Sequence, residues 1–328
     1  MNSSRPIKRI AIVDCGHPAH VANAILKILT EEYKFEITED YDADYVFHSC
    51  MGYEVLKYTG IRIYVGGECV SPNFNISDYA LTFDQLEFGD RYHWFPLIKI
   101  YETAYANLAR PRLATDTVLA QNRDFCAYVM SNTSNSAPER IEIFDKLSAY
   151  KQVHSGGRWR NNVGGPIQDK LAFQSKHKFV IAFENQLSPG YLTEKFAEAA
   201  HAGAIPIYWG DSNIGNYLNT KAFINCHEYP SLDAAIAEVI AIDQDPTRYK
   251  AMLAEHWFKN GVEPEALKSE NIRKFLRNIL DQDHEKAYRR NLGRWGIKYE
   301  RSLRRMYYHP LQQLFQDIRA RLRGKHTL

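Results

Sequence analysis

Three polar residues lie together near the middle of the chain, at the expected start of a helix. Tyr191, Glu194 and Lys195 occur in GYLTEK, where a polar loop runs into a segment with the composition of a helix. The free N–H groups and the positive dipole end of a helix N-terminus favour an anion, and a phosphate is the obvious candidate. The residue types also allow a structural interpretation, in which Glu194 complements the dipole, Lys195 is solvated and Tyr191 packs in the loop.

A second group of candidate anion-binding residues lies in the glycine-rich stretch SGGRWRNNVGGP, which carries Arg158 and Arg160. A guanidinium can hold a diphosphate through two parallel hydrogen bonds, and glycines let a backbone approach a ligand closely. The stretch matches neither GxGxxG nor GxxxxGK[ST], so its pattern alone is a weak indication. Either arginine could instead be an ordinary surface charge.

A candidate general base, Glu68, lies in the stretch VGGECVSPNFN. Gly66 and Gly67 allow the backbone to turn sharply after the preceding apolar run, and Pro72 keeps the following loop from becoming a helix. A carboxylate in a strand-end loop can accept a proton from a substrate. The alternative is a loop glutamate exposed to water.

The elements that must position Tyr191, Glu194 and Lys195 form a strand–helix–strand unit. The apolar runs 178–183 and 205–209 predict strands, and 193–202 predicts a helix with Thr193 at its cap and Gly203 after its end. Ligands of open α/β sheets bind beyond the carboxyl ends of the strands, so the loop 184–192 is the expected site.

The rest of the chain alternates in the same way, which predicts an α/β protein with parallel sheets. A chain of 328 residues suggests two domains, and residues 100–123, which mix charge with few periodic apolar positions, are the expected interdomain connection. We expect domains at 1–122 and 123–283, followed by a tail at 284–328. Further elements are predicted near 9–14, 21–29, 35–38, 45–48, 62–65, 124–130 and 139–150.

No motif in the sequence requires a metal ion. His17 and His20 have HxxH spacing but no further ligand nearby, and the three DxD triplets, at 42–44, 243–245 and 281–283, lie at expected caps and turns. We therefore expect no metal site and no obligatory cofactor, and leave stimulation by Mg²⁺ or Mn²⁺ open.

The chain is expected to be cytoplasmic. Its amino terminus has only the short apolar run 10–13, which predicts neither a secretory signal nor a membrane anchor, and no stretch approaches the ~20 apolar residues of a spanning helix. The five cysteines are odd in number and scattered, as is typical of reduced thiols.

The carboxyl-terminal tail is strongly basic. From residue 285 onward, twelve Lys or Arg stand against three Asp or Glu, so this stretch carries +9 while the remainder carries −7 of the net +2. Its aromatic and apolar residues recur at intervals typical of amphipathic helices, which favours contact with an anionic membrane surface. Packing back on the first domain is the alternative, and nucleic acid is a poorer partner because no reading motif is present.

The run FENQLSPGYLTEKFAEAAHAGAIPIYWG resembles the donor-binding signature of the α-1,3/4-fucosyltransferases, family ten of the glycosyltransferases. Two further parts of the chain resemble segments of the same family: the run of GE, SPNF, DYA and FGDRY, and the Arg–Asn pair of the glycine-rich loop. The resemblance implies a GT-B fold of two Rossmann-like domains facing each other across a cleft, with acceptor bound by the first domain and GDP-fucose by the second.

The resemblance also implies roles for particular residues. Glu68 matches the catalytic base, although one extra glycine precedes it here, and Arg160 with Asn161 matches the pair on the donor pyrophosphate. The implied donor-binding residues are Arg160, Glu184, Asn185, Tyr191, Glu194 and Lys195.

The implied reaction is the inverting transfer of L-fucose from GDP-fucose to O3 of GlcNAc or Glc in a Gal-GlcNAc or Gal-Glc acceptor. Its products would be Lewis-type or fucosyllactose glycans of bacterial lipopolysaccharide or oligosaccharide synthesis. Bacterial members often end in a similar basic tail, which implies peripheral contact of residues 284–328 with the inner face of the inner membrane. A GT-B transferase that uses another sugar nucleotide and a non-catalytic glycan-binding protein remain alternatives.

Overall fold

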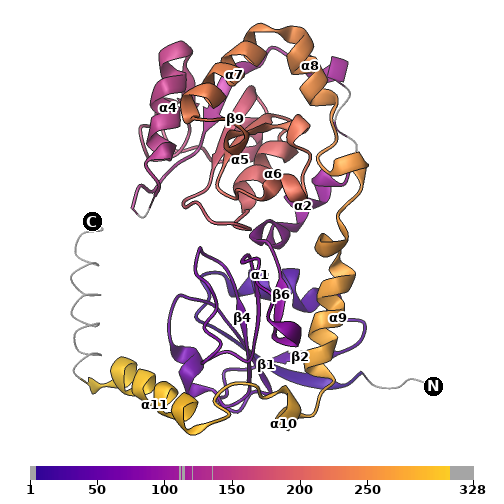
Figure 1. The fold of residues 1–328 in the computed structure, drawn as a ribbon, viewed down its shortest axis with the longest axis vertical. Coiled ribbons are helices and arrows are strands. Elements are labelled where there is room, and N and C mark those ends of the chain that lie inside the picture. The colour runs from indigo at the N-terminus through magenta and orange to yellow at the C-terminus, as the bar shows by residue number, and fades with distance from the viewer. Residues whose placement is uncertain (1–4, 111, 113–114, 120, 135, 311–328) are drawn as a thin grey trace. The chain divides into compact units, whose positions relative to one another are not determined.

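The chain folds into two compact α/β units, each built on its own sheet (Figure 1). The computed structural model describes residues 5–110, 112, 115–119, 121–134 and 136–310. The first unit comprises the described residues of 1–82, 87–93 and 272–328, and the second comprises those of 83–86 and 94–271.

The first unit has a six-stranded sheet in the order β2-β1-β3-β4-β5-β6, and the pairs from β2 to β5 are parallel. β3, β4 and β5 are buried along their whole lengths, as parallel strands covered on both faces must be. The strands are β1 (Ile7–Val13), β2 (Lys34–Ile37), β3 (Tyr45–His48), β4 (Ile61–Val65), β5 (Tyr79–Thr82) and β6 (Tyr92–Trp94). The helices are α1 (Pro18–Ala24), most of α9 (Ser269–Leu280), α10 (His284–Ala287) and α11 (Arg294–Tyr308).

The second unit has a five-stranded parallel sheet in the order β11-β10-β9-β7-β8. Alternate residues of β9 enter two different apolar clusters, Phe179 with helices α4 and α7, and Val180 with α2 and α6. The strands are β7 (Asp124–Tyr128), β8 (Val153–Ser155), β9 (His177–Phe183), β10 (Ile205–Trp209) and β11 (Ile224–Asn225). The helices are α2 (Glu102–Leu108), α3 (Thr115–Leu119), α4 (Glu139–Tyr150), α5 (Lys170–Gln174), α6 (Glu194–His201), α7 (Leu232–Gln244) and α8 (Pro246–Ala254).

The predicted α/β class with parallel sheets is confirmed, with local differences. The helix expected over 21–29 is split, because α1 ends at Ala24 and a 3₁₀ turn covers Leu26–Leu29. Residues 102–108, expected in the interdomain connection, form α2, which packs against α6 through Ala104, Tyr105 and Leu108. The apolar face of α2 was not predicted, because one short helix has too few turns to show the helical period in its sequence.

The described part of the basic tail packs on the first unit. The Arg62 guanidinium on β4, which is fully buried, donates to Glu300 of α11 at 2.9 Å, and Arg290 pairs with the buried Asp78. Tyr307 and Leu303 add apolar contact with the first sheet. Contacts therefore group residues 272–310 with the first unit, whereas the predicted boundaries put 272–283 in the second domain. Residues 311–328 of the predicted tail lie outside the described residues.

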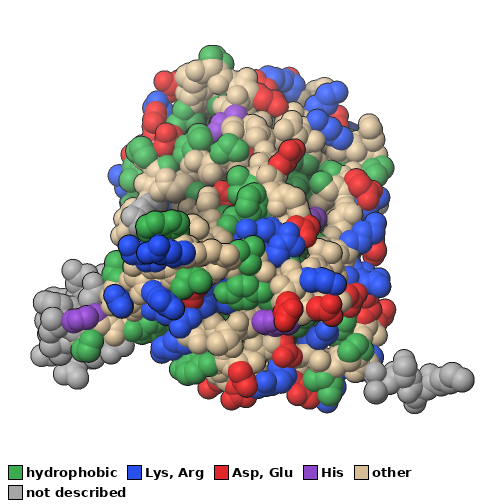
Figure 2. All heavy atoms as spheres, turned by 60° about the horizontal axis from the view of Figure 1, so that its bottom comes forward, with side chains coloured by type: hydrophobic (Ala, Val, Ile, Leu, Met, Phe, Trp, Pro, Cys, Tyr) green, Lys and Arg blue, Asp and Glu red, His purple; other side chains and the backbone are tan. Residues whose placement is uncertain are grey.

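The 284–310 region also carries exposed apolar residues among its basic ones. Leu292 and Trp295 are 78% and 70% exposed, and Ile297, Tyr299 and Met306 are also open to solvent. Figure 2 shows Lys and Arg side chains beside hydrophobic ones on the side of the molecule where the described chain ends. Among the described helices, none is both long enough and apolar enough to cross a membrane.

Candidate functional site

The predicted strand–helix–strand unit forms as β9, α6 and β10, with β9 and β10 parallel. Glu184 directly follows β9 at its carboxyl end, and α6 begins at Glu194 with Thr193 at the N-cap position. Glu184 is fully buried, and its N–H donates to the carbonyl oxygen of Trp209 at 2.9 Å, which continues the β9–β10 pairing by one residue. The site therefore lies at the edge of the sheet where ligands of parallel α/β folds bind.

Four side chains at this edge form one bonded group, which we call the α6 cluster: Glu184, Thr193, Glu194 and Lys195. Glu184 accepts from the Thr193 N–H at 2.8 Å and from the Thr193 hydroxyl at 2.6 Å. The Lys195 Nζ atom lies 3.0 Å from Glu184 Oε2, 3.0 Å from Thr193 Oγ1 and 3.1 Å from Glu194 Oε1. The structure thus brings together three of the six predicted donor-binding residues.

Burial and mutual attraction decide the ionisation of this cluster. Burial raises the pKa of Glu184 above its ordinary value, an effect that Lys195 and the Thr193 donors partly offset. Burial also opposes ionisation of Glu194, but the ammonium of Lys195 outweighs it and lowers the pKa of Glu194 to about 2. For Lys195 the two carboxylates outweigh the cost of burial and raise its pKa, so the ammonium stays charged.

The cluster uses groups that the sequence analysis expected to be available for a ligand. An ammonium has three N–H donors, and three protein acceptors surround Nζ of Lys195. The Glu184 carboxylate takes the Thr193 N–H at the start of α6, where a phosphate was expected. Direct contact of Lys195 with a phosphate stays a prediction, and it requires one of these acceptors to be exchanged for a phosphate oxygen.

A second buried carboxylate, Asp211, holds the loop that carries Tyr191. Asp211 follows β10 and Gly210, and its Oδ1 atom accepts from the N–H groups of Gly190 at 2.7 Å and Asn213 at 2.8 Å. Burial raises the pKa of Asp211 to about 6. Its Oδ2 atom is buried with no hydrogen-bond partner among the described residues. Tyr191 itself is 2% exposed, with its ring edge-on to Phe83 at 5.0 Å.

Two glycines at this edge are required by their surroundings. Gly190 has φ +83, and a Cβ there would lie 2.1 Å from the carbonyl oxygen of Phe83. Gly210 has φ +154, and its Cβ would lie 2.4 Å from Cγ of Glu184. Both the backbone conformation and the space therefore exclude a side chain at the two positions.

Asn185 connects the cluster region to a buried arginine that the sequence analysis did not select. Its Oδ1 atom accepts from Arg140 Nη1 at 2.8 Å, and the same nitrogen donates to Ser136 Oγ at 2.9 Å. Arg140 is 4% exposed, and its Nε atom has no hydrogen-bond partner among the described residues. A buried guanidinium held by neutral acceptors is a candidate anion-binding group. Sequence reasoning missed it because it lies inside α4, far from any glycine-rich motif.

The glycine-rich loop is closed by Asn161 rather than by its arginines. The Asn161 amide donates to the carbonyls of Gly157 at 2.7 Å and Gly165 at 2.9 Å, and its Oδ1 accepts from the Gly165 N–H at 2.8 Å. Gly157 is needed because a Cβ would lie 2.0 Å from the Met130 carbonyl oxygen.

Arg160 has φ +43, its guanidinium lies over the Trp159 ring at 4.6 Å, and it pairs with Asp145 of α4. This pairing is separate from the α6 cluster. The role of Arg160 on a pyrophosphate stays a prediction.

Glu68 lies where the sequence predicted, in the loop that follows β4 of the first unit. The side chain is exposed, and the Glu68 carbonyl accepts from the Val70 N–H at 2.7 Å. The Tyr64 hydroxyl donates to the Val70 carbonyl at 2.8 Å, which closes the loop back on β4. Gly66 is required here, since its Cβ would lie 2.1 Å from Oγ1 of Thr82.

The comparisons with known proteins match this chain over both units. A family described as "Glycosyltransferase family 10 (fucosyltransferase) C-term" matches residues 119–294, and "Alpha-(1,3)-fucosyltransferase FucT N-terminal domain" matches residues 10–101. An alpha-(1,3)-fucosyltransferase FucT of Helicobacter pylori is 30% identical over an alignment 296 positions long that covers 78% of this chain. The chain spans 61% of the length of that relative.

Solved structures agree with the sequence comparison. A crystal structure of an alpha1,3-fucosyltransferase has a TM-score of 0.75 at 27% identity and covers 86% of this chain and 92% of its own. A structure of alpha1,3-fucosyltransferase with GDP-fucose has a TM-score of 0.73 at 27% identity, with 86% and 93% covered. This likeness confirms the GT-B class predicted from the sequence.

Proposed function

Because the chain belongs to the glycosyltransferase family 10 fucosyltransferases, we propose that it transfers L-fucose from GDP-fucose to a sugar hydroxyl. The acceptor is a Gal-GlcNAc or Gal-Glc oligosaccharide, the hydroxyl is O3 of GlcNAc or Glc, and the anomeric carbon is inverted. Lewis-type or fucosyllactose glycans are the products.

The observation that supports this proposal most strongly is the α6 cluster. Two carboxylates and one ammonium are held together at the start of a helix, directly beyond a parallel strand, inside the segment that matches the family. Glu184 is buried, and Glu194 and Lys195 are partly buried. Replacing such an ion pair by apolar side chains is often neutral or stabilising, so a structural role alone is a weak reason to keep three charges at this edge. The cluster presents Glu194 and Lys195 to hydroxyl and phosphate groups of a nucleotide sugar.

On the donor side, the diphosphate needs cationic contacts that grow stronger as the GDP leaves. Arg160 is the cation implied by its match to the family, and Arg140 is a second candidate because its Nε atom is buried without a partner. Lys195 contributes by giving one N–H to the phosphate in exchange for Glu194, which is then free to accept from a ribose or fucose hydroxyl. Tyr191, Glu184 and Asn185 hold these groups in place.

On the acceptor side, Glu68 acts as the general base. It takes the proton of the acceptor hydroxyl as that oxygen forms a bond to the anomeric carbon, and the bond from that carbon to the β-phosphate oxygen breaks with its electron pair leaving on GDP. One base opposite the leaving group produces inversion, by analogy with inverting glycosidases. The exposed carboxylate is accessible to an incoming acceptor.

No step of this scheme requires a metal ion or a cofactor, and Mg²⁺ or Mn²⁺ acts at most by screening the diphosphate.

The exposed apolar and basic residues of the 284–310 region support peripheral contact with an anionic membrane surface, and Leu292 and Trp295 are the most exposed of its apolar residues. Replacing Leu292 and Trp295 by Ser should reduce sedimentation of the chain with anionic vesicles and leave transfer to a soluble acceptor unchanged. Equal sedimentation of variant and wild type would contradict the membrane proposal.

The decisive experiment incubates the chain with GDP-fucose and either N-acetyllactosamine or lactose, followed by linkage analysis of the product. Parallel reactions with GDP-mannose and UDP-sugars test the alternative donors. We expect GDP release and an α-1,3-linked fucose only with GDP-fucose. Transfer from another donor would redirect the proposal within the GT-B class, and glycan binding without GDP release would indicate a non-catalytic protein.

A further inference from the structure

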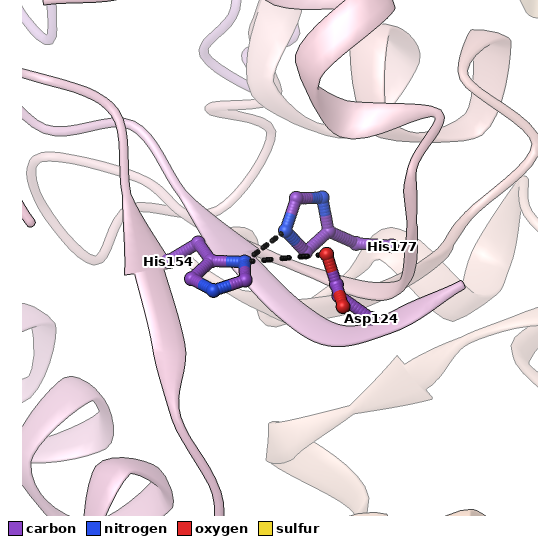
Figure 3. A group of neighbouring side chains, drawn as sticks. All are labelled: Asp124, His154 and His177. Atoms are coloured by element: carbon purple, nitrogen blue, oxygen red, sulfur yellow. Dashed lines mark hydrogen bonds and ion pairs between the residues drawn. The ribbon is translucent and has the colours of Figure 1, made fainter. Parts of the chain in front are cut away.

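A group of three potential metal ligands lies in the second unit, away from the α6 cluster. Asp124 is the first residue of β7, His154 is the middle residue of β8, and His177 is the first residue of β9. One ligand atom from each of the three lies within 4.8 Å of the other two (Figure 3). His154 Nδ1 is 2.8 Å from His177 Nε2 and 3.6 Å from Asp124 Oδ2.

The hydrogen bonds of His177 leave one nitrogen directed at the group. Its Nδ1 atom lies 2.9 Å from the Phe173 carbonyl oxygen, an acceptor, so Nδ1 carries the proton and Nε2 holds a lone pair. A backbone carbonyl on the far nitrogen is the usual partner that orients a metal-binding histidine. In the metal-free protein, His154 donates its Nδ1–H to this lone pair. To bind an ion through Nδ1, His154 adopts the other neutral tautomer, with its proton on Nε2.

The group is separate from the proposed donor site. Asp124 and His177 stand at the amino ends of β7 and β9, which pair in register. Glu184 follows the carboxyl end of the same β9 strand. The length of β9 therefore separates the two positions, so an ion bound here would not contact the reacting groups.

We propose that Asp124, His154 and His177 bind a divalent transition metal ion, with Zn²⁺ as the best match, that ties β7, β8 and β9 together. Two imidazoles and a carboxylate suit Zn²⁺, Co²⁺ or Ni²⁺, whereas Mg²⁺ and Ca²⁺ prefer oxygen ligands. This proposal is independent of the proposed transferase activity.

The two spacings that involve His154 need only a small adjustment to fit such an ion. Ligands about 2.0–2.1 Å from a tetrahedral Zn²⁺ lie roughly 3.3 Å apart, so the 3.6 Å separation of Asp124 and His154 already fits. The 2.8 Å separation of the imidazoles must widen by about half an ångström. His154, whose side chain is 24% exposed, has room to turn, and the exposed Asp124 leaves a fourth position open to water.

The test uses the full chain, stripped with EDTA and kept reduced, titrated with Zn²⁺ by calorimetry and with Co²⁺ by visible absorption. We expect one ion per chain, an increase in the thermal midpoint with Zn²⁺, and a Co²⁺ spectrum without the near-ultraviolet thiolate band that cysteine ligation would produce. Mg²⁺ and Ca²⁺ should give no comparable increase.

Two variants and a matched control decide the assignment. Asp124→Asn and His154→Gln, at side chains that are 61% and 24% exposed, should each weaken Zn²⁺ affinity at least tenfold. His201→Gln, a histidine of the same unit outside the group, should bind as the wild type does. Absence of Zn²⁺ binding, unchanged affinity in both variants, or a thiolate band would overturn the proposal.

Discussion

The Lys195 ammonium lies 3.0 Å from Oε2 of Glu184, a carboxylate with no exposed surface. The pair spans the step from the end of β9 to the first turn of α6, so its geometry depends on both elements. Because Oε1 of Glu194 also accepts a hydrogen bond from this ammonium, Lys195 holds two carboxylates close together. Structure and proposed donor binding therefore depend on the same lysine.

Replacing Lys195 by Met should both destabilise the second unit and weaken GDP binding. Removing one partner of a buried pair leaves the other uncompensated, at a cost of about 3 kcal/mol in the free energy of unfolding. Chemical denaturation measures that cost, and calorimetry with GDP below the unfolding transition measures affinity, expected to fall at least tenfold. A folded Lys195→Met protein with wild-type GDP affinity would remove Lys195 from the donor site.

Glu68→Gln should abolish turnover while leaving GDP affinity and thermal stability as in the wild type. The amide keeps the shape of the side chain but cannot accept the acceptor proton, and loss of a general base costs about 10²–10⁴-fold in kcat. Glu31→Gln, another exposed glutamate of the first unit, is the matched control. Full activity of Glu68→Gln would rule out its role as the base.

Arg160→Gln should weaken GDP binding at least tenfold with little change in stability. Its ion pair with Asp145 has side chains 48% and 50% exposed, and such surface pairs contribute about 0–1 kcal/mol. Arg158→Gln, two residues away in the same loop, tests whether any charge in the loop suffices. If Arg158→Gln lowers affinity and Arg160→Gln does not, the assignment to Arg160 is wrong.

Gly210→Ala should displace Glu184 from the α6 cluster. The new Cβ would lie 2.4 Å from Cγ of Glu184, and overpacking of this kind costs about 1–3 kcal/mol of stability. We expect a lower thermal midpoint and a higher KM for the donor. Gly293→Ala is the control, because no atom lies within 4 Å of its Cβ. Equal behaviour of the two variants would show that Gly210 tolerates a side chain.

Asp211 should make stability fall as pH rises through the mildly acidic range. Its folded-state pKa is raised from 3.8 to about 6, so the native state prefers the protonated form. The contribution to stability is complete below the unfolded pKa and is lost as pH rises through about 6. We expect the unfolding free energy of the wild type to fall relative to that of Asp211→Asn as the pH rises through this window. A difference between the two proteins that stays constant with pH would contradict the assignment.

Much of the donor side could be predicted from sequence because its parts are close together in the chain. The strand, the loop and the helix from Lys178 to His201 follow one another directly, so their order and the edge where their side chains gather follow from local pattern. What the pattern could not supply was the state of those side chains. The Lys195 ammonium is paired rather than simply solvated, because the buried Glu184, eleven residues earlier, accepts a hydrogen bond from it.

Residues that are distant in sequence were decided only by the tertiary structure. Arg62 meets Glu300 across 238 positions, which makes the basic tail part of the first unit. His154 and His177 come from two strands that do not pair with each other and meet only because β7 lies between those strands in the sheet. Composition and periodicity indicate which residues prefer burial or a helix. They do not indicate which charges pair or which ligands converge, because those depend on strand order. Strand order is set by the packing of the whole chain.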